Sequence, residues 1–338
     1  MNSTNLSHCV PDTSHFSSPE FQSLALHIMS SIEIPINLFG AWIILFRTPP
    51  TMSSVKWPML NLHFWSSFLD VSISLLVCPV VLFPSIAGYT MGLFSMLGVG
   101  NLLQIHTVLT SLGLVINSLL SVFENRHYIL SPRTNAWHRY RTTFLTASYL
   151  VMFTYLIPFT ITSPEQEGAK KVVFKSLPCL PPSIYDEDVF VYTLDIIPIF
   201  LAISILFSAQ LCAILMFATL TLRVFIGSSR RGAFSQKTIT LQKKFLVGLI
   251  IQTTIPIFVI FCPTAYILIS VPKGYHNQTF NNFTLITFSL HGLLSTLSML
   301  LIHKPYRLAT LNVFSSCSTP KTSASTVWNA STASFRIY

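Results

Sequence analysis

Residues 189–222, VFVYTLDIIPIFLAISILFSAQLCAILMFATLTL, form a long apolar stretch in which Asp195 is the single charged residue. A helix rises about 1.5 Å per residue, so about 20 residues cross the roughly 30 Å of hydrocarbon in a bilayer. No water is present there, and only a helix satisfies the backbone polar groups of such a segment internally. Together with six further runs, this stretch predicts seven transmembrane helices; the other runs are residues 24–46, 59–83, 97–123, 142–162, 245–270 and 283–302.

The composition agrees with an all-α membrane protein. The 338 residues are 51% hydrophobic and 9% charged, against about 25% charged in soluble proteins. The net charge of +9 would suggest nucleic acid as the partner of a soluble protein, but here the basic residues lie in loops beside the lipid bilayer. We expect no nucleic-acid partner. The predicted organisation is an extracellular N-tail (1–23), a seven-helix transmembrane domain (24–302), a juxtamembrane amphipathic helix (303–316) and a disordered cytoplasmic tail (317–338).

Basic residues set the predicted orientation. Sixteen of the twenty Lys and Arg residues fall on one side of the seven runs, in the first, third and fifth connecting segments and the C-terminal tail. Because basic loops stay on the cytoplasmic side, the sequence predicts an outside N-terminus and an inside C-terminus.

Sequons and cysteines on the predicted outer side are consistent with this orientation. Glycosylation is expected at sequons that begin at Asn2, Asn5, Asn277 and Asn282. Cys9 and Cys179 are the two cysteines on the oxidising side, so a disulfide between them is one interpretation and two separate thiols the other.

The predicted inner end of the third helix carries Glu124, Asn125 and Arg126. A Glu–Arg pair at this place could break when the bundle opens and expose Arg126 to a partner; ordinary snorkelling of charges at a membrane edge is the alternative. The fifth connecting segment is the most basic, and we interpret it as a docking surface for a cytosolic partner. Its candidate contacts are Arg230, Arg231, Lys243 and Lys244.

Carboxylates deeper in the runs invite a functional reading, because a charge at mid-membrane costs about 2.5–3.5 kcal/mol on insertion scales. Asp70 and Asn37 lie at similar depths and are predicted to share a polar cluster with Ser295 or Ser298; a protonated Asp with a packing role is the alternative. Polar residues on predicted outer halves are candidate ligand contacts, although isolated histidines are often packing residues. These candidates are Gln104, His106, Asp195, Tyr266 and His291.

Pro305 follows the seventh run and suits the first turn of a new helix. Leu308, Leu311 and Phe314 would fall along one side of that helix, as expected for a short helix on the inner membrane face. Pro305, Tyr306 and Arg307 are further candidates for contact with the cytosolic partner.

Enzyme signatures are missing from the sequence: it has no Gly-rich phosphate loop, no Cys or His cluster at metal spacing and no nucleophile elbow. We therefore expect no catalysis, no cofactor and no metal.

Seven ordered blocks carry a resemblance to the nematode serpentine chemoreceptors of class H. They are SPEF (18–21), IEIPI (32–36), SVKW (54–57), LNLHFWS (60–66), FENR (123–126), LPCLP (177–181) and KPYR (304–307). The resemblance implies a seven-helix receptor in the plasma membrane of chemosensory neuron cilia, which senses an odorant or soluble chemical cue and signals through a heterotrimeric G protein. Dimerisation is left open.

The match to rhodopsin-like receptors is looser. Asn125 separates the acidic residue from Arg126, no Asn-Pro-x-x-Tyr lies within the seventh run, and no Cys opens the third. Two other classes remain as alternatives: a ligand-gated channel or transporter, disfavoured because the sequence lacks repeat symmetry, and a non-signalling accessory membrane protein.

Overall fold

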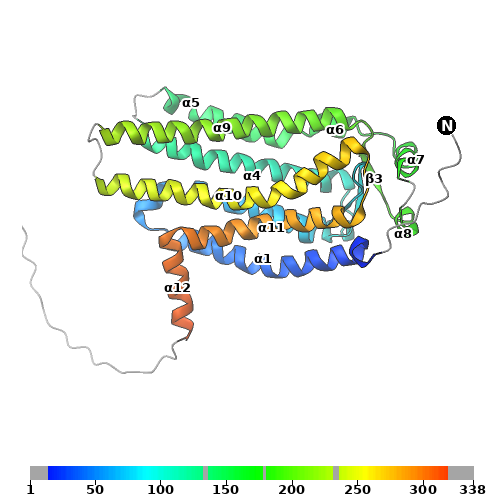
Figure 1. Cartoon of the computed structure of the whole chain (residues 1–338), viewed down its shortest axis with the longest axis horizontal. Helices are drawn as coiled ribbons and strands as arrows, with labels where there is room; N and C mark the ends of the chain where they lie inside the picture. Colours follow the sequence, from blue (N-terminus) through cyan, green and yellow to red (C-terminus); the bar gives the residue numbers. More distant parts are fainter. Residues whose placement is uncertain (1–13, 132–135, 178–179, 231–235, 319–338) are drawn as a thin grey trace, which may run out of the picture.

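The computed structural model describes residues 14–131, 136–177, 180–230 and 236–318 as a bundle of long helices that lie side by side (Figure 1). The long helices are α1 (Pro19–Arg47), α2 (Ser53–Val71), α4 (Asn101–Leu130), α5 (Trp137–Thr154), α9 (Ile196–Arg230), α10 (Gln236–Lys273) and α11 (Gln278–Ile302). α1 packs against α2 and α11, α4 lies between α2 and α9, and α10 packs on α11. The expected mostly helical membrane architecture is therefore confirmed.

Six helical segments in the described part of the chain are long and apolar enough to cross a membrane. They are Pro19–Arg47, Asn101–Leu130, Trp137–Ile161, Ile196–Gly227, Leu246–Lys273 and Gln278–Ile302. The second predicted helix corresponds to α2, which continues into the π-helical segment η3 (Ser72–Leu76) and is flanked by α1 and α4.

Local sequence explains where several helices begin. The Ser18 hydroxyl accepts a hydrogen bond from the Phe21 N–H at 3.1 Å, and Pro19 occupies the first turn of α1. The Asn277 side chain caps α11 in the same way, through Phe280 N–H at 2.9 Å. The fourth predicted run is divided between α5 and the short helix α6 (Ile157–Ile161), which has Pro158 in its first turn.

Two predicted runs were too long, because each includes a β-strand. The run 59–83 leaves its helix after Leu76, Cys78 turns the chain with φ of 43°, and β1 (Pro79–Val81) follows. The run 189–222 begins with β3 (Phe190–Thr193) before α9. Short apolar strands and buried helices have the same hydropathy, so the sequence pattern could not separate them.

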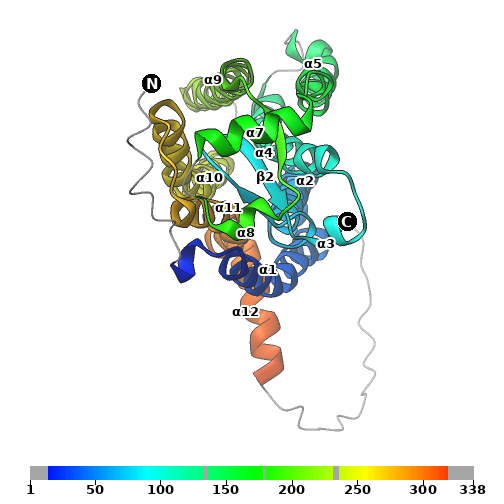
Figure 2. The same ribbon diagram turned by 90° about the vertical axis from the view of Figure 1, so that its right-hand side faces the viewer.

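β1, β2 (Ile86–Thr90) and β3 form an antiparallel sheet in the order β1-β2-β3, with Val80 opposite Tyr89 and Ala87 opposite Val191. Helices α7 (Gln166–Ser176) and α8 (Pro182–Tyr185) lie with the sheet across one end of the bundle (Figure 2). This end, called the sheet end below, has its own core of eleven buried apolar residues, which includes Leu82, Val173 and Val191.

At the opposite end, α12 (Lys304–Ser318) turns away from the bundle and points to its side (Figure 1). We call this the α12 end. Tyr306 is fully buried against α1 and α2 in a cluster with Ile43 and Met59, whereas Leu308, Leu311 and Phe314 are exposed. The remaining short elements are η1 (His15–Ser17), η2 (Pro50–Met52) and α3 (Leu93–Met96).

Candidate functional site

The bundle interior holds a fully buried carboxylate, Asp70, bound to α11. Asp70 accepts hydrogen bonds from the backbone N–H groups of Gly292 at 3.0 Å and Leu293 at 2.8 Å, and His291 Nδ1 lies 3.1 Å from the same carboxylate. Gly292 is required at this contact, since an added Cβ would collide with the Asp70 carboxylate. The contact ties the C-terminal end of α2 to the middle of α11.

A second polar group joins three helices one turn away. The Thr296 hydroxyl donates to Asn37 Oδ1 at 2.7 Å, and His63 Nε2 donates to the Asn37 backbone carbonyl at 2.8 Å. Gly40 permits this approach, since a Cβ there would lie 2.9 Å from the His63 ring and 2.7 Å from Thr296 Cγ2.

The two residues that the sequence predicted together, Asn37 and Asp70, thus both contact α11, but through partners other than the predicted serines. The Ser298 hydroxyl donates to the Leu294 carbonyl of its own helix at 2.6 Å. Thr296 occupies the place that Ser295 or Ser298 was expected to fill. The rotation of α11 about its own axis decides which of residues 295–298 faces α1. The hydropathy pattern does not determine that rotation.

Two further buried polar contacts were not anticipated from the sequence. The Ser74 hydroxyl donates to the buried Glu33 carboxylate, which joins η3 to α1. Between α4, α5 and α9, the Ser148 hydroxyl donates to Asn117 Oδ1, and Gln210 Nε2 lies 3.4 Å from the same oxygen. The sequence signal that could have indicated the contacts between α4, α5 and α9 is the presence of isolated polar residues within apolar runs.

Near the α12 end, Glu124 is fully buried and bound by two side chains of α5. Arg141 Nε lies 3.0 Å from both carboxylate oxygens, and Trp137 Nε1 donates to Oε1 at 2.8 Å. Arg141 Nη2 also donates to Asn125 Oδ1 at 3.1 Å, and Asn125 Nδ2 donates to the Ser54 carbonyl at 3.0 Å. This set connects α4 with α2 and α5.

The predicted pair between Glu124 and Arg126 is therefore corrected: the ion pair that the structure shows for Glu124 is with Arg141. Residues two apart on a helix point in different directions, so Glu124 and Arg126 do not face each other. Arg126 is instead buried at 5% exposure and lies within electrostatic range of Tyr306 and His303, where α12 begins.

The other predicted contacts for a cytosolic partner gather at the α12 end. Lys243 and Lys244 are exposed near the start of α10, and Arg307 is exposed on α12, with its Nη1 donating to the Leu301 carbonyl at 3.3 Å. Pro305 lies in the first turn of α12. Arg230 is the last residue of α9, and Arg231 lies outside the described residues.

Each of the five predicted ligand contacts forms a hydrogen bond with a different partner within the protein. Gln104 is buried and donates to the Val99 carbonyl at 2.7 Å, and His106 contacts the Thr160 hydroxyl. Tyr266 donates to Asn281 Oδ1 at 2.7 Å. Asp195 is exposed and caps α9 through the Ile197 N–H at 3.1 Å, as a helix-end residue does. His291 contacts Asp70 in the interior, as described above, so its ligand role stays a prediction, as do those of the other four.

The structure does not support glycosylation at Asn282. This side chain is fully buried, and its amide nitrogen donates to the carbonyls of Phe16 at 2.9 Å and Ser18 at 3.2 Å. Asn277 is partly exposed and stays a candidate. Asn2, Asn5, Cys9 and Cys179 lie outside the described residues.

Within the described ranges, no group of three or more His, Cys, Asp or Glu side chains is placed to hold a metal ion.

Long apolar helices packed around buried polar contacts define a multi-pass membrane protein. A sequence model of the family described as serpentine type 7TM GPCR chemoreceptor Srh matches residues 17–316. The chain belongs to this family of seven-transmembrane receptors, which are not enzymes, and the predicted resemblance is confirmed. It is 27% identical over 319 residues to serpentine receptor class H-72 of Caenorhabditis elegans, covering 90% of this chain and 89% of that relative.

Proposed function

We propose that this receptor binds a small chemical at the sheet end, outside the cell, and activates a heterotrimeric G protein at its α12 end. Its proposed location is the plasma membrane of chemosensory neuron cilia, with the orientation that the basic loops predict. The family supports both kinds of partner, and the distribution of exposed basic residues supports the side on which the G protein would dock.

The position of Arg126 is the observation that carries the proposal. Arg126 sits near the end of α4, is buried, and lies within electrostatic range of Tyr306 and His303 at the junction of α11 and α12. A movement of the α11–α12 junction away from α4 would uncover this guanidinium at the end of the bundle where Lys243 and Lys244 are exposed. A buried cation that becomes accessible is suited to bind acidic or carbonyl groups of an inserted partner segment.

The polar contacts in the interior offer a way to couple the two ends. Asp70 with His291, and Asn37 with Thr296, fix α11 against α2 and α1 at successive turns. A ligand shifts the balance between two arrangements only by its difference in affinity for them, so the ligand must contact helices that move relative to one another. α11 is the natural mobile element, because it leads directly into α12.

Nucleotide exchange on purified heterotrimeric G proteins tests the proposal. Receptor in lipid nanodiscs should accelerate GTP-analogue uptake when an agonist is present, and Arg126→Ala should abolish this acceleration while surface expression in cells stays intact. Lys56→Ala, which removes a basic residue near the start of α2, is the matched control and should retain activity. Normal exchange by Arg126→Ala would contradict the proposed role of Arg126.

A further inference from the structure

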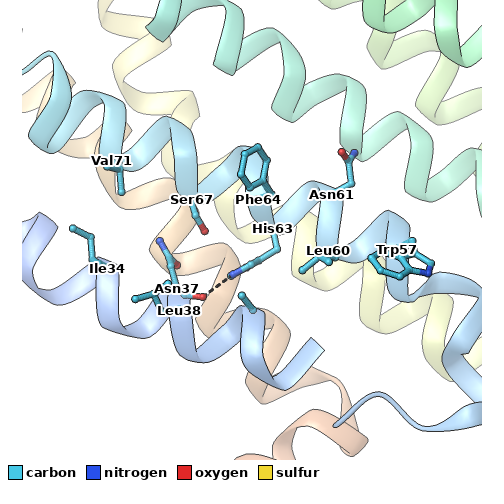
Figure 3. Close-up of a pocket in the computed structure, with 11 residues that line it drawn as sticks. Ile34, Asn37, Leu38, Trp57, Leu60, Asn61, His63, Phe64, Ser67 and Val71 are labelled. Atoms are coloured by element: carbon cyan, nitrogen blue, oxygen red, sulfur yellow. Dashed lines mark hydrogen bonds between the residues drawn. The ribbon is translucent and has the colours of Figure 1, made fainter. Parts of the chain in front are cut away.

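A groove of about 490 Å³ runs between α1 and α2 on the outside of the bundle (Figure 3). Leu38 and Phe64 at its edge are 67% and 55% exposed, which places the opening on the surface that faces lipid. Its volume is typical of small-molecule sites, which combine apolar walls with a few polar groups. The apolar part of the lining includes Ile34, Leu38, Ala41, Leu60, Phe64 and Val71.

Two buried polar atoms in the lining have no hydrogen-bond partner among the described residues. They are Asn37 Nδ2 and Ser67 Oγ. Asn37 is only 5% exposed, and its other polar groups are used, because Oδ1 accepts from Thr296 and the backbone carbonyl accepts from His63. Figure 3 shows the Asn37 amide and the Ser67 hydroxyl on facing sides of the groove.

Unsatisfied donors are costly at this depth. Asn37 lies ten residues before Arg47, which at 1.5 Å per residue is about 15 Å, or half of the hydrocarbon thickness. An amide or hydroxyl group without a partner in such surroundings costs about 1–3 kcal/mol by protein mutational measurements. An oxygen atom with two lone pairs can accept a hydrogen bond from each of these groups.

We propose that the groove between α1 and α2 binds a neutral, lipid-soluble small molecule whose carbonyl or hydroxyl oxygen accepts hydrogen bonds from Asn37 Nδ2 and Ser67 Oγ. The rest of the molecule lies along the apolar walls. A carboxylate, an ammonium group or a phospholipid headgroup does not fit, because charge at mid-membrane is strongly unfavourable. A plain acyl chain does not fit either, since it leaves both donors unsatisfied.

The packing at the sheet end favours entry into the groove from the lipid bilayer rather than from the water at that end. Leu82, Val173, Val189 and Val191 are at most 3% exposed within the packed sheet and α7, which lie across the end of the bundle (Figure 2). A molecule that arrives from water at this end meets a closed apolar core, whereas one dissolved in the bilayer reaches the groove directly. The inference concerns binding alone and does not depend on G-protein coupling.

Photolabelling tests the proposal with the full-length protein in lipid nanodiscs. The probe is a diazirine derivative of 2-nonanone, and cross-linked peptides are identified by mass spectrometry. Label is expected on residues 34–41 and 57–71. Excess 2-nonanone should suppress this labelling, while n-nonane at the same concentration should not, because it offers no acceptor.

Separate substitutions test how much the hydrogen bond and the apolar walls each contribute to binding. Ser67→Ala should weaken competition by 2-nonanone three- to tenfold, the change expected from one hydrogen bond. Its matched control, Ser31→Ala, removes an exposed hydroxyl of α1 that bonds the Ile28 carbonyl and should leave competition unchanged. Ala41→Leu should fill the groove and abolish labelling, whereas Ala202→Leu on α9 should not.

Three results would overturn the proposal. They are equal competition by n-nonane, label confined to other segments or absent at saturating probe, and competition by 2-nonanone that Ser67→Ala leaves unchanged. The Ser67→Ala comparison keeps the test decisive if Ala41→Leu fails to fold.

Discussion

Arg141 Nε lies 3.0 Å from the Glu124 carboxylate, and this contact fixes α5 against α4 near the α12 end. Glu124 is fully buried, whereas the Arg141 side chain is 26% exposed and stacks over the Tyr128 ring at 4.0 Å. Since removal of one partner leaves a buried charge uncompensated, the pair is expected to matter more for stability than an exposed ion pair.

Arg141→Ala should lower the free energy of unfolding by about 1–3 kcal/mol, a value reduced from that of a fully buried pair because Arg141 is partly exposed. Thermal unfolding in detergent measures the change. The control Arg139→Ala, an exposed position on the same helix, should change stability by less than about 0.5 kcal/mol. In a double-mutant cycle with Glu124→Gln, strictly additive losses would show that the two residues do not interact.

Gly292→Ala should destabilise the protein by about 1–3 kcal/mol, because the new methyl group would lie 2.7 Å from the Ser66 carbonyl and collide with Asp70. Melting temperature and the yield of monodisperse protein report the effect. Gly227→Ala on α9 is the matched control, since nothing lies within 4 Å of its added Cβ. Equal stability of the two variants would mean that α2 and α11 are farther apart than described.

The burial of His303 leads us to expect that the free energy of unfolding decreases in acid. Burial, and then the positive charge of Arg126, lower the pKa of His303 from 6.5 to about 4, and its Nε2 donates to Gln252 Oε1 at 2.9 Å. The folded state thus binds the proton less readily than the unfolded state, so this contribution is present above pH 6.5 and is lost as the pH falls from 6.5 towards 4.

The expected loss between pH 7.5 and pH 5 is on the order of 1–2 kcal/mol from this group. It should be smaller in His303→Gln than in the unmodified protein. Unfolding curves in detergent at both pH values provide the comparison, and an identical pH dependence in the two proteins would exclude His303 as the cause.

Orientation can be tested on intact cells. An epitope at the N-terminus should bind antibody without permeabilisation, and one at the C-terminus only after it, because the basic segments favour the cytoplasm. Asn277→Gln should remove one glycan, whereas Asn282→Gln should leave the glycan pattern unchanged, since its amide is buried against Phe16 and Ser18. Antibody access to the C-terminal epitope on intact cells would contradict this orientation and indicate the opposite one.

The helical membrane architecture was accessible from the sequence because apolar runs of sufficient length have few alternatives in a bilayer. The strands were not. Val80 and Val191 lie in runs whose hydropathy is compatible with helix, and they became strands only through pairing with β2, which is distant from β3 in sequence. The pairing of β3 with β2 is long-range and leaves little local trace.

The candidate site was less predictable than the fold. Glu124 and Arg126 were both singled out from the sequence, but the choice of Arg141 as the partner of Glu124 depends on how α5 docks against α4. Helix geometry alone argued against a contact between residues two positions apart. Likewise, Thr296 rather than Ser295 or Ser298 meets Asn37, because the contacts of Gly292 and Leu293 with Asp70 fix the rotation of α11.

The central claim, that this chain is a chemoreceptor acting through G proteins, is tested most directly by recording responses to odorants and metabolites in expressing cells. The recording is made with and without functional heterotrimeric G proteins, and surface expression is confirmed in both. We expect a stimulus-evoked response that vanishes when the G proteins are absent. A current that persists without them would contradict the account and identify a ligand-gated channel instead.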